Sequence, residues 1–150
     1  MPATSTLAAP SEIQTFQFAN DRLIAAPIDI VFETILEPLG PLAEMKLKLE
    51  AWPGGRWFRD LGDNTGHLWG HVQVIKPPKL LEICGPMMMS YPAAGFMQYR
   101  LTEEPGGTKL SFRHQIIGLL APEHVEGMPK GWTQCLDAIK EKAESKRGKK

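Results

Sequence analysis

The sequence lacks an excess of either charge, because its 150 residues include 17 lysines and arginines against 17 aspartates and glutamates. Proteins that bind nucleic acids draw much of their affinity from basic side chains that face phosphates. The balanced charge therefore argues against a nucleic-acid partner. The last six residues, SKRGKK, are basic, but so short a basic segment at a chain end is typical of a solvated tail.

Cysteines and long apolar runs are also scarce. The two cysteines, Cys84 and Cys135, lie far apart and form no CxxC motif, so we expect reduced thiols in a cytoplasmic protein. No stretch approaches the ~20 apolar residues of a membrane-spanning helix. The opening MPATSTLAAPSE has neither the basic start nor the apolar run of a secretory signal. We therefore expect no membrane span, and a flexible tail over residues 1–11.

Motifs of several enzyme classes are absent from the sequence. It contains no P-loop, no GxGxxG and no GxSxG, so no cofactor is predicted. His67 and His71 would lie about 13 Å apart along a strand, too far to share one zinc ion, and no metal site is predicted. The carboxylates that could act as general acids or bases fall near turns or at outward positions: Asp60, Asp63, Glu82, Glu103 and Glu104.

The patterns that are present indicate a strand, a short helix, a run of strands and a final helix. Residues 13–25 alternate in part, and residues 28–35 carry apolar side chains at helical spacing after Pro27. Short alternating segments separated by Gly- and Pro-rich turns fill residues 45–118, which predicts an antiparallel meander of about six strands.

The helical pattern returns after Pro122 and is clearest over residues 131–144, where apolar side chains share one face. This helix is the only element long enough to cover one face of the sheet, whose apolar residues would otherwise meet water. We expect a single domain over residues 12–145 and a basic tail over residues 146–150.

Four segments, in this order, resemble the SRPBCC superfamily, which has the helix-grip fold of START domains and birch-pollen-allergen-like proteins. They are IAAPIDIVFETI, PGGRWF, GHVQVIKPPKLLEI, and EPGGTKLSFRHQIIG together with GWTQCLDAIK. They are most similar to the branch named after the activator of heat-shock protein 90 ATPase. The resemblance implies an α+β helix-grip fold: a curved antiparallel sheet of about six to seven strands wrapped around a long C-terminal helix, with short helices after the first strand. It also implies a cavity between the sheet and the last helix.

Strand alternation predicts which side chains face that cavity. On the last two strands the inward positions are Met97, Tyr99 and Leu101, and then Leu110, Phe112, His114 and Ile116. A Met-rich turn and the last helix supply the remaining wall. The predicted ligand-binding residues are Met87, Met89, Phe96, Met97, Tyr99, Phe112, His114, Trp132, Cys135 and Leu136.

Three hypotheses for function follow. The first is binding of a small hydrophobic or aromatic ligand without chemistry, because a mostly apolar wall with a few polar groups suits a pocket. The second is an enzyme that uses His114 and Tyr99 as acid and base, which requires a pKa near neutrality for His114. His114 could instead be a satisfied core histidine, Met87–Met89 could simply pack as a loop, and Trp132 could be plain core.

The third hypothesis is a protein–protein module that docks on itself or on a chaperone. In HLWGHVQV, the apolar set Leu68, Gly70, Val72 and Val74 is expected to face inward unless a β-bulge shifts the register. Trp69 and His71 are then predicted on the outer face, as a homodimer surface. Full-length eukaryotic co-chaperones of the family name carry an additional domain, so the chaperone partner is left open.

Overall fold

The chain folds into one curved antiparallel sheet whose inner face is covered by a long helix. The computed structural model describes residues 11–147. Its seven strands pair in the order β1-β7-β6-β5-β4-β3-β2. Their bounds are β1 Gln14–Ile24, β2 Leu47–Leu49, β3 Arg56–Gly62, β4 Thr65–Lys76, β5 Leu80–Gly85, β6 Ala93–Glu104 and β7 Gly107–Gly118.

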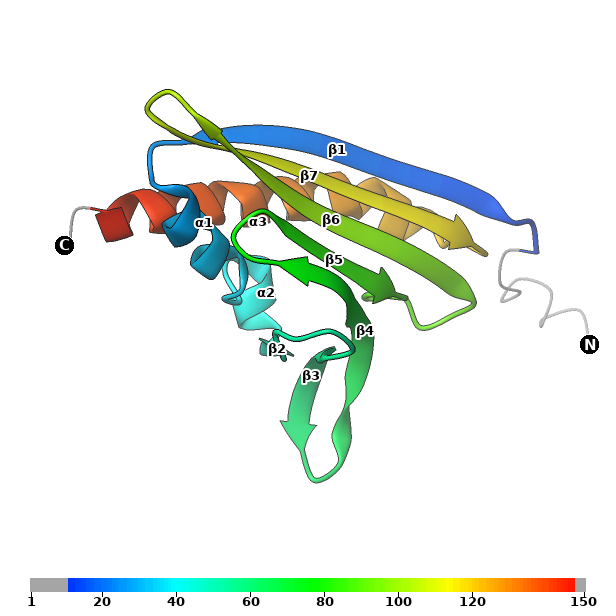
Figure 1. Ribbon diagram of the computed structural model, residues 1–150. Coiled ribbons are helices and arrows are strands. Elements are labelled where there is room, and N and C mark those ends of the chain that lie inside the picture. The colour runs from blue at the N-terminus through cyan, green and yellow to red at the C-terminus, as the bar shows by residue number, and fades with distance from the viewer. Residues whose placement is uncertain (1–10, 148–150) are drawn as a thin grey trace, which may run out of the picture.

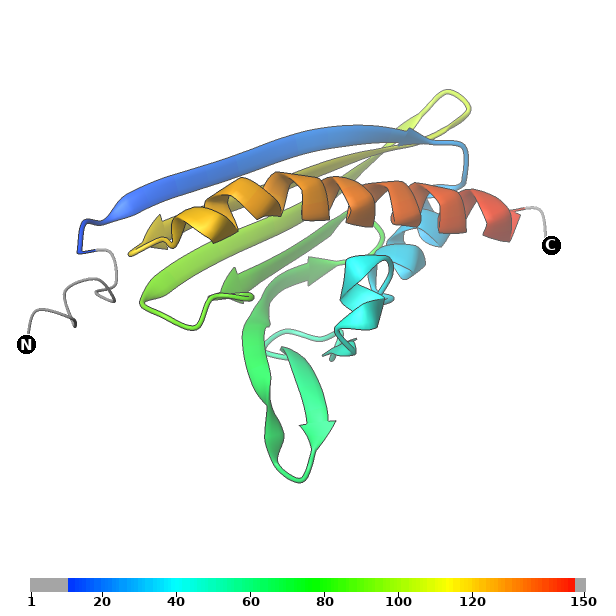
Figure 2. The ribbon, with the colours of Figure 1, turned by 180° about the vertical axis from the view of Figure 1, so that it is seen from behind.

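Three helices lie on the same side of this sheet: α1 (Ile28–Ile35), α2 (Pro41–Glu44) and α3 (Pro122–Arg147). Figure 1 shows the sheet from its outer face, with α3 behind it. Figure 2 shows α3 running along β1, β7 and β6, with α1 and α2 beside its C-terminal half. This arrangement confirms the predicted helix-grip fold, including the short helices after the first strand.

The helix α1 begins where the sequence predicts it. Pro27 precedes the first helical residue with φ −61° and ψ 152°, the extended conformation that a residue before a helix adopts. The helix then buries Val31, Phe32 and Ile35 in the core. Their spacing places them on one face, which is the reason that so short a helix is stable here.

The helix α3 is longer than the clearest part of its pattern. It begins at Pro122 and contains Gly127, Pro129 and Gly131 within its first three turns. Each of these residues disfavours a helix interior, which is why the sequence pattern is clear only from residue 131. At the other end α3 includes Lys146 and Arg147, so these two residues do not belong to the predicted tail. The rest of that tail, and residues 1–10 of the predicted N-terminal tail, lie outside the described residues.

The inward positions on β6 and β7 are as predicted. Tyr99 pairs with Phe112 and Met97 with His114 across the two strands, and all four side chains are buried. Residues directly opposite in an antiparallel pair share a face, so one apolar surface spans both strands. Phe96, which the sequence places in the ligand-binding set, is half-buried and alternates with buried Met97, so it lies on the opposite face of β6.

Strand β4 departs from the predicted register at Trp69. Trp57 pairs with Gly70 and Phe58 pairs with Leu68, so Trp69 is an extra residue in β4 with no direct partner in β3. This is a β-bulge, and it turns Trp69 inward, where its side chain is only 1% exposed, while Leu68 is 45% exposed. The prediction that Trp69 lies on the outer face and Leu68 inside was wrong. Burial of the large indole against Trp57, with ring centroids 5.1 Å apart, favours the bulged arrangement.

A candidate ligand cavity beside the last helix

A cavity of about 190 Å³ lies between α3, α2 and the sheet. The N-terminal half of α3 forms the longest wall, through residues from Glu123 to Cys135. Pro41 and Leu42 of α2, with Met45 just after it, form the second wall. Trp69 of β4 and Met88 of the turn after β5 close the side next to the sheet.

The walls of this cavity are almost entirely apolar. Met45, Met88 and Met128 supply flexible thioether side chains, and Trp132 supplies an aromatic surface. Among the described residues that line it, Glu123 alone carries a charge and is exposed. Such walls favour an uncharged apolar ligand, because a buried charge without a partner costs much free energy.

Two glycines keep the cavity open on the α3 side. Gly127 and Gly131 are four residues apart and therefore lie on the same face of the helix. A Cβ atom added at either position would meet no heavy atom within 4 Å. The missing side chains therefore leave space rather than allow a close contact.

Polar groups at the cavity are few and differ in their hydrogen bonding. The indole N–H of Trp69 is buried and has no hydrogen-bond partner among the described residues. Burial raises the pKa of the Cys135 thiol to about 11, although a hydrogen bond with the backbone of Leu42 acts in the opposite direction. The thiol is therefore protonated near neutral pH and adds no charge to the wall.

At the outer end of the cavity, His124 is held by Tyr91. The Tyr91 hydroxyl and His124 Nδ1 lie 2.8 Å apart, and the two rings stack with centroids 5.5 Å apart. The same hydroxyl accepts a hydrogen bond from the backbone N–H of Ala121. These contacts fix the start of α3 against the segment that follows the Met-rich turn.

His114 lies deep in the core and does not line the cavity. Trp132 donates its indole N–H to His114 Nδ1 at 2.8 Å, which requires that Nδ1 carry no proton. Burial lowers the pKa of His114 to about 4, so the ring is neutral at physiological pH. Its Nε2 is buried and, within residues 11–147, has no hydrogen-bond partner. His114 is thus a neutral core residue that orients Trp132.

Tyr99 is not poised for proton transfer either. Its side chain is buried, and burial raises the pKa of its hydroxyl above the ordinary value for a tyrosine. With the pKa of His114 shifted down and that of Tyr99 shifted up, neither group exchanges a proton readily near pH 7. The opposite pKa shifts of the two groups therefore disfavour the predicted acid–base pair.

The cavity contains only part of the predicted ligand-binding set. Trp132 and Cys135 line it. Phe112, His114, Leu136, Met87 and Met89 are buried in the core outside its walls. Met97 and Tyr99 border a separate space of about 20 Å³, which holds little more than one water molecule.

Several lining residues were not found from the sequence. Of the Met-rich turn, Met88 reaches the cavity, whereas Met87 and Met89 pack inward. The α2 residues and the two α3 glycines carry no periodic signal that could identify them. The Met-rich composition was the one usable signal, but it could not indicate which methionine faces the space.

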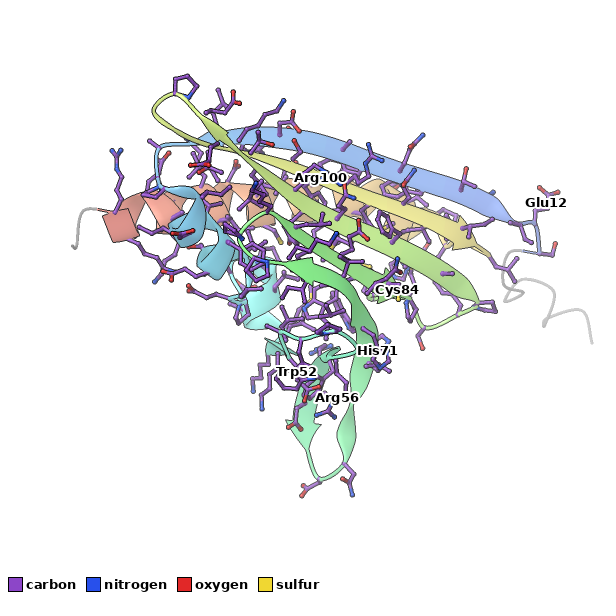
Figure 3. All side chains as sticks on the ribbon, in the orientation of Figure 1. Glu12, Trp52, Arg56, His71, Cys84 and Arg100 are labelled. Atoms are coloured by element: carbon purple, nitrogen blue, oxygen red, sulfur yellow. The ribbon has the colours of Figure 1, made fainter. Side chains whose placement is uncertain are left out.

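The sequence predicts Trp69 as a surface residue, whereas the structure places it in the wall of the cavity. His71 remains exposed and pairs with Cys84 of β5 on the face away from α3 (Figure 3). A homodimer surface that includes His71 stays a prediction, but buried Trp69 cannot contribute to it.

Within residues 11–147, no cluster of three histidine, cysteine or acidic side chains is arranged to hold a metal ion. Over the same residues, no helix combines the length and hydropathy needed to cross a bilayer. Both cysteines are free thiols.

Comparison with known families yields one match over most of the chain. The family model described as "Activator of Hsp90 ATPase homolog 1-like protein" matches residues 25–144. No curated protein matches the sequence.

Solved structures share the fold at low sequence identity. An uncharacterized protein from Rhizobium leguminosarum is 22% identical, with 89% of this chain and 97% of that chain covered and a TM-score of 0.70. CalU16 from Micromonospora echinospora is 20% identical, with 92% and 93% covered and a TM-score of 0.59. The di-domain ARO/CYC protein BexL is 18% identical over 89% of this chain and 50% of that chain, with a TM-score of 0.58. At these identities the likeness shows the fold alone.

Proposed function

The chain belongs to the Activator of Hsp90 ATPase homolog 1-like family, and from this membership and its cavity we propose that it binds a small hydrophobic or aromatic ligand between α2, α3 and β4. The observation that carries the proposal is the apolar space of about 190 Å³ beside α3. An apolar cavity of about 150 Å³ in another protein stays dry and binds benzene. The space here suits a ligand of one or two rings.

The shape of the wall supports binding rather than simple packing. Glycine in a helix interior costs roughly 1 kcal/mol relative to alanine, and α3 carries two glycines that both face this space. Alanine would favour the helix at either position, at exposed Gly127 as well as at half-buried Gly131. The two glycines thus lower the stability of α3 while they leave the volume open, as expected for a wall that a ligand contacts.

The location and partners of the protein stay predictions. Free thiols at Cys84 and Cys135 are compatible with a cytoplasmic location. A homodimer and a chaperone partner stay predictions of the same kind.

The first experiment is native mass spectrometry of the freshly purified protein, followed by solvent extraction and identification of any bound molecule. We expect a co-purifying apolar or aromatic compound at one copy per chain. If the protein is empty, titration with small aromatic probes replaces the extraction. A protein that retains no compound and binds no probe at millimolar concentration would contradict the proposal.

A cavity-filling variant makes the test specific for this space. In Gly131→Leu the new side chain projects into the open volume, so ligand occupancy should fall at least tenfold. The free energy of unfolding should not decrease, because leucine is a better helix former than glycine. The matched control is Gln134→Leu, which adds the same side chain to an exposed position of α3 and should leave occupancy unchanged. Equal occupancy in Gly131→Leu and in the control would exclude this cavity as the binding site.

A further inference from the structure

Trp69 is held rigidly in the cavity wall. The β-bulge in β4 turns it inward, and Trp57 packs edge-on against its ring. Its carbonyl accepts a hydrogen bond of 2.8 Å from the backbone N–H of Met87. With backbone and ring both constrained, the indole N–H cannot turn away to find another partner.

This N–H is nevertheless left without an acceptor. Trp69 is 1% exposed, and its Nε1 has no hydrogen-bond partner in the part of the chain that the structure describes. Native proteins rarely leave a buried donor unpaired, because the lost hydrogen bond with water is not replaced. The second cavity indole makes the contrast clear, since Trp132 donates its N–H to His114 Nδ1.

We propose that Trp69 selects ligands that carry an uncharged hydrogen-bond acceptor, such as a ketone or ester oxygen, by donating its indole N–H to that oxygen. This inference rests on the proposed function and names the chemistry of the ligand in the same cavity. An apolar molecule with one such oxygen fills the space and satisfies the unpaired donor at once.

The charges around the cavity exclude an anionic acceptor. Among residues 11–147, neither a lysine nor an arginine lines the space, and the charged residue that does so is the exposed Glu123. A carboxylate would lose its hydration without gaining a cation, and Glu123 would repel it. A neutral carbonyl loses far less hydration and gains the bond to Trp69.

Access to the donor requires a small rearrangement of the wall. Neighbouring atoms cover Nε1 almost completely. Met45, Met88 and Met128 line the same space, and the unbranched side chain of methionine changes conformation at low cost. The proposed hydrogen bond requires that one such change bring a ligand oxygen within reach of the N–H.

The test compares acetophenone, isopropylbenzene and benzoate, three ligands of similar shape with a neutral acceptor, no acceptor and a charged acceptor. Affinities are measured by titration for the wild-type protein and for Trp69→Phe, which keeps an aromatic ring but removes the N–H. The ratio of acetophenone to isopropylbenzene affinity should fall about fivefold in Trp69→Phe, the effect of losing one hydrogen bond. Benzoate should bind neither protein detectably.

The control variant is Trp52→Phe, which makes the same change at an exposed position outside the cavity and should leave the ratio unchanged. An unchanged ratio in Trp69→Phe, as expected if a retained water satisfies the N–H, would overturn the inference while leaving the proposed cavity intact. Failure of all three probes to bind the wild-type protein would overturn both. Benzoate binding as tight as that of acetophenone would overturn the selection for a neutral acceptor.

A second measurement needs no variant. In the wild-type protein, the assigned indole N–H resonance of Trp69 should move downfield on addition of acetophenone and move much less with isopropylbenzene. The resonance of Trp132, whose N–H is already bonded, should show no such difference. Equal shifts of the Trp69 resonance with both probes would contradict the hydrogen bond.

Discussion

His114 illustrates how burial decides the role of a single residue. The sequence places it on the inner face of the last strand, and its side chain is indeed fully buried there. Whether such a histidine is catalytic depends on what surrounds it, and here aromatic rings and the Trp132 N–H surround it. Alternation along a strand cannot reveal these neighbours, because Trp132 belongs to another element, α3, and Phe16 to β1.

The charge state of His114 predicts a pH dependence of stability. Its pKa is lowered from 6.5 to about 4 by burial, so between these values the unfolded chain binds more protons than the folded one. Stability is therefore complete above pH 6.5 and is lost as the pH falls toward 4. We expect His114 to lower the free energy of unfolding by about 2 kcal/mol between pH 7 and pH 5. Urea unfolding at the two pH values measures this difference.

The variant His114→Gln should lose most of this pH dependence, because glutamine does not titrate. Its amide oxygen can accept the Trp132 N–H, which makes the variant milder than alanine. The range from pH 7 to 5 avoids the titration of Glu50. Its hydrogen bond with Arg56 is the largest cause that lowers the pKa of Glu50 to about 2. The stability that Glu50 contributes is therefore lost only below pH 4.5. A variant with the same decrease between pH 7 and 5 as the wild-type protein would show that His114 is not the titrating group.

At the level of elements, the two halves of α3 are stabilised differently. The C-terminal half buries Leu136, Ile139 and Ala143. It is also tied to the end of β1, because Lys140 Nζ donates to the Leu23 carbonyl at 2.6 Å and Glu144 accepts the Ala25 N–H at 2.9 Å. The N-terminal half buries Met128 and Trp132, but it also borders the cavity.

We expect hydrogen exchange to follow this division. Amides at residues 124–131 should exchange about tenfold or more faster than those at 133–143, because two glycines weaken this part of the helix by roughly 2 kcal/mol. Pro129 also has no N–H to donate to the preceding turn. Hydrogen exchange measured by mass spectrometry or NMR tests this directly, and a bound cavity ligand should slow the first group selectively. Uniform protection along α3 would contradict the division.

The bulge in β4 is another feature that belongs to an element rather than to a residue. One extra residue places both Trp69 and Gly70 on the buried side and moves Leu68 outward. The strict alternation expected from the sequence is therefore broken at the one position that matters for the cavity. Its cause is the packing of Trp69 against Trp57 from the neighbouring strand, which a pattern within one strand cannot report.

At the scale of the whole molecule, ligand binding should raise thermal stability. A ligand that binds only the folded chain at 100 times its dissociation constant stabilises it by about 2.7 kcal/mol. For a protein of 150 residues this corresponds to a Tm increase of about 5–10 °C. Scanning calorimetry with acetophenone should show this shift in the wild-type protein and not in Gly131→Leu. An unchanged Tm at saturating ligand would argue against binding to the native state.

The sequence by itself determined the order of the elements and the inner faces of β6, β7 and the C-terminal half of α3. Those features follow from local periodicity, since alternation and helical spacing are set within each segment. Only the tertiary structure decided where the cavity lies. Its walls come from α2, β4, the Met-rich turn and α3, and the missing side chains at Gly127 and Gly131 become a cavity only because other elements face them. The inward turn of Trp69 was decided in the same way, by the energy of burying its ring against Trp57.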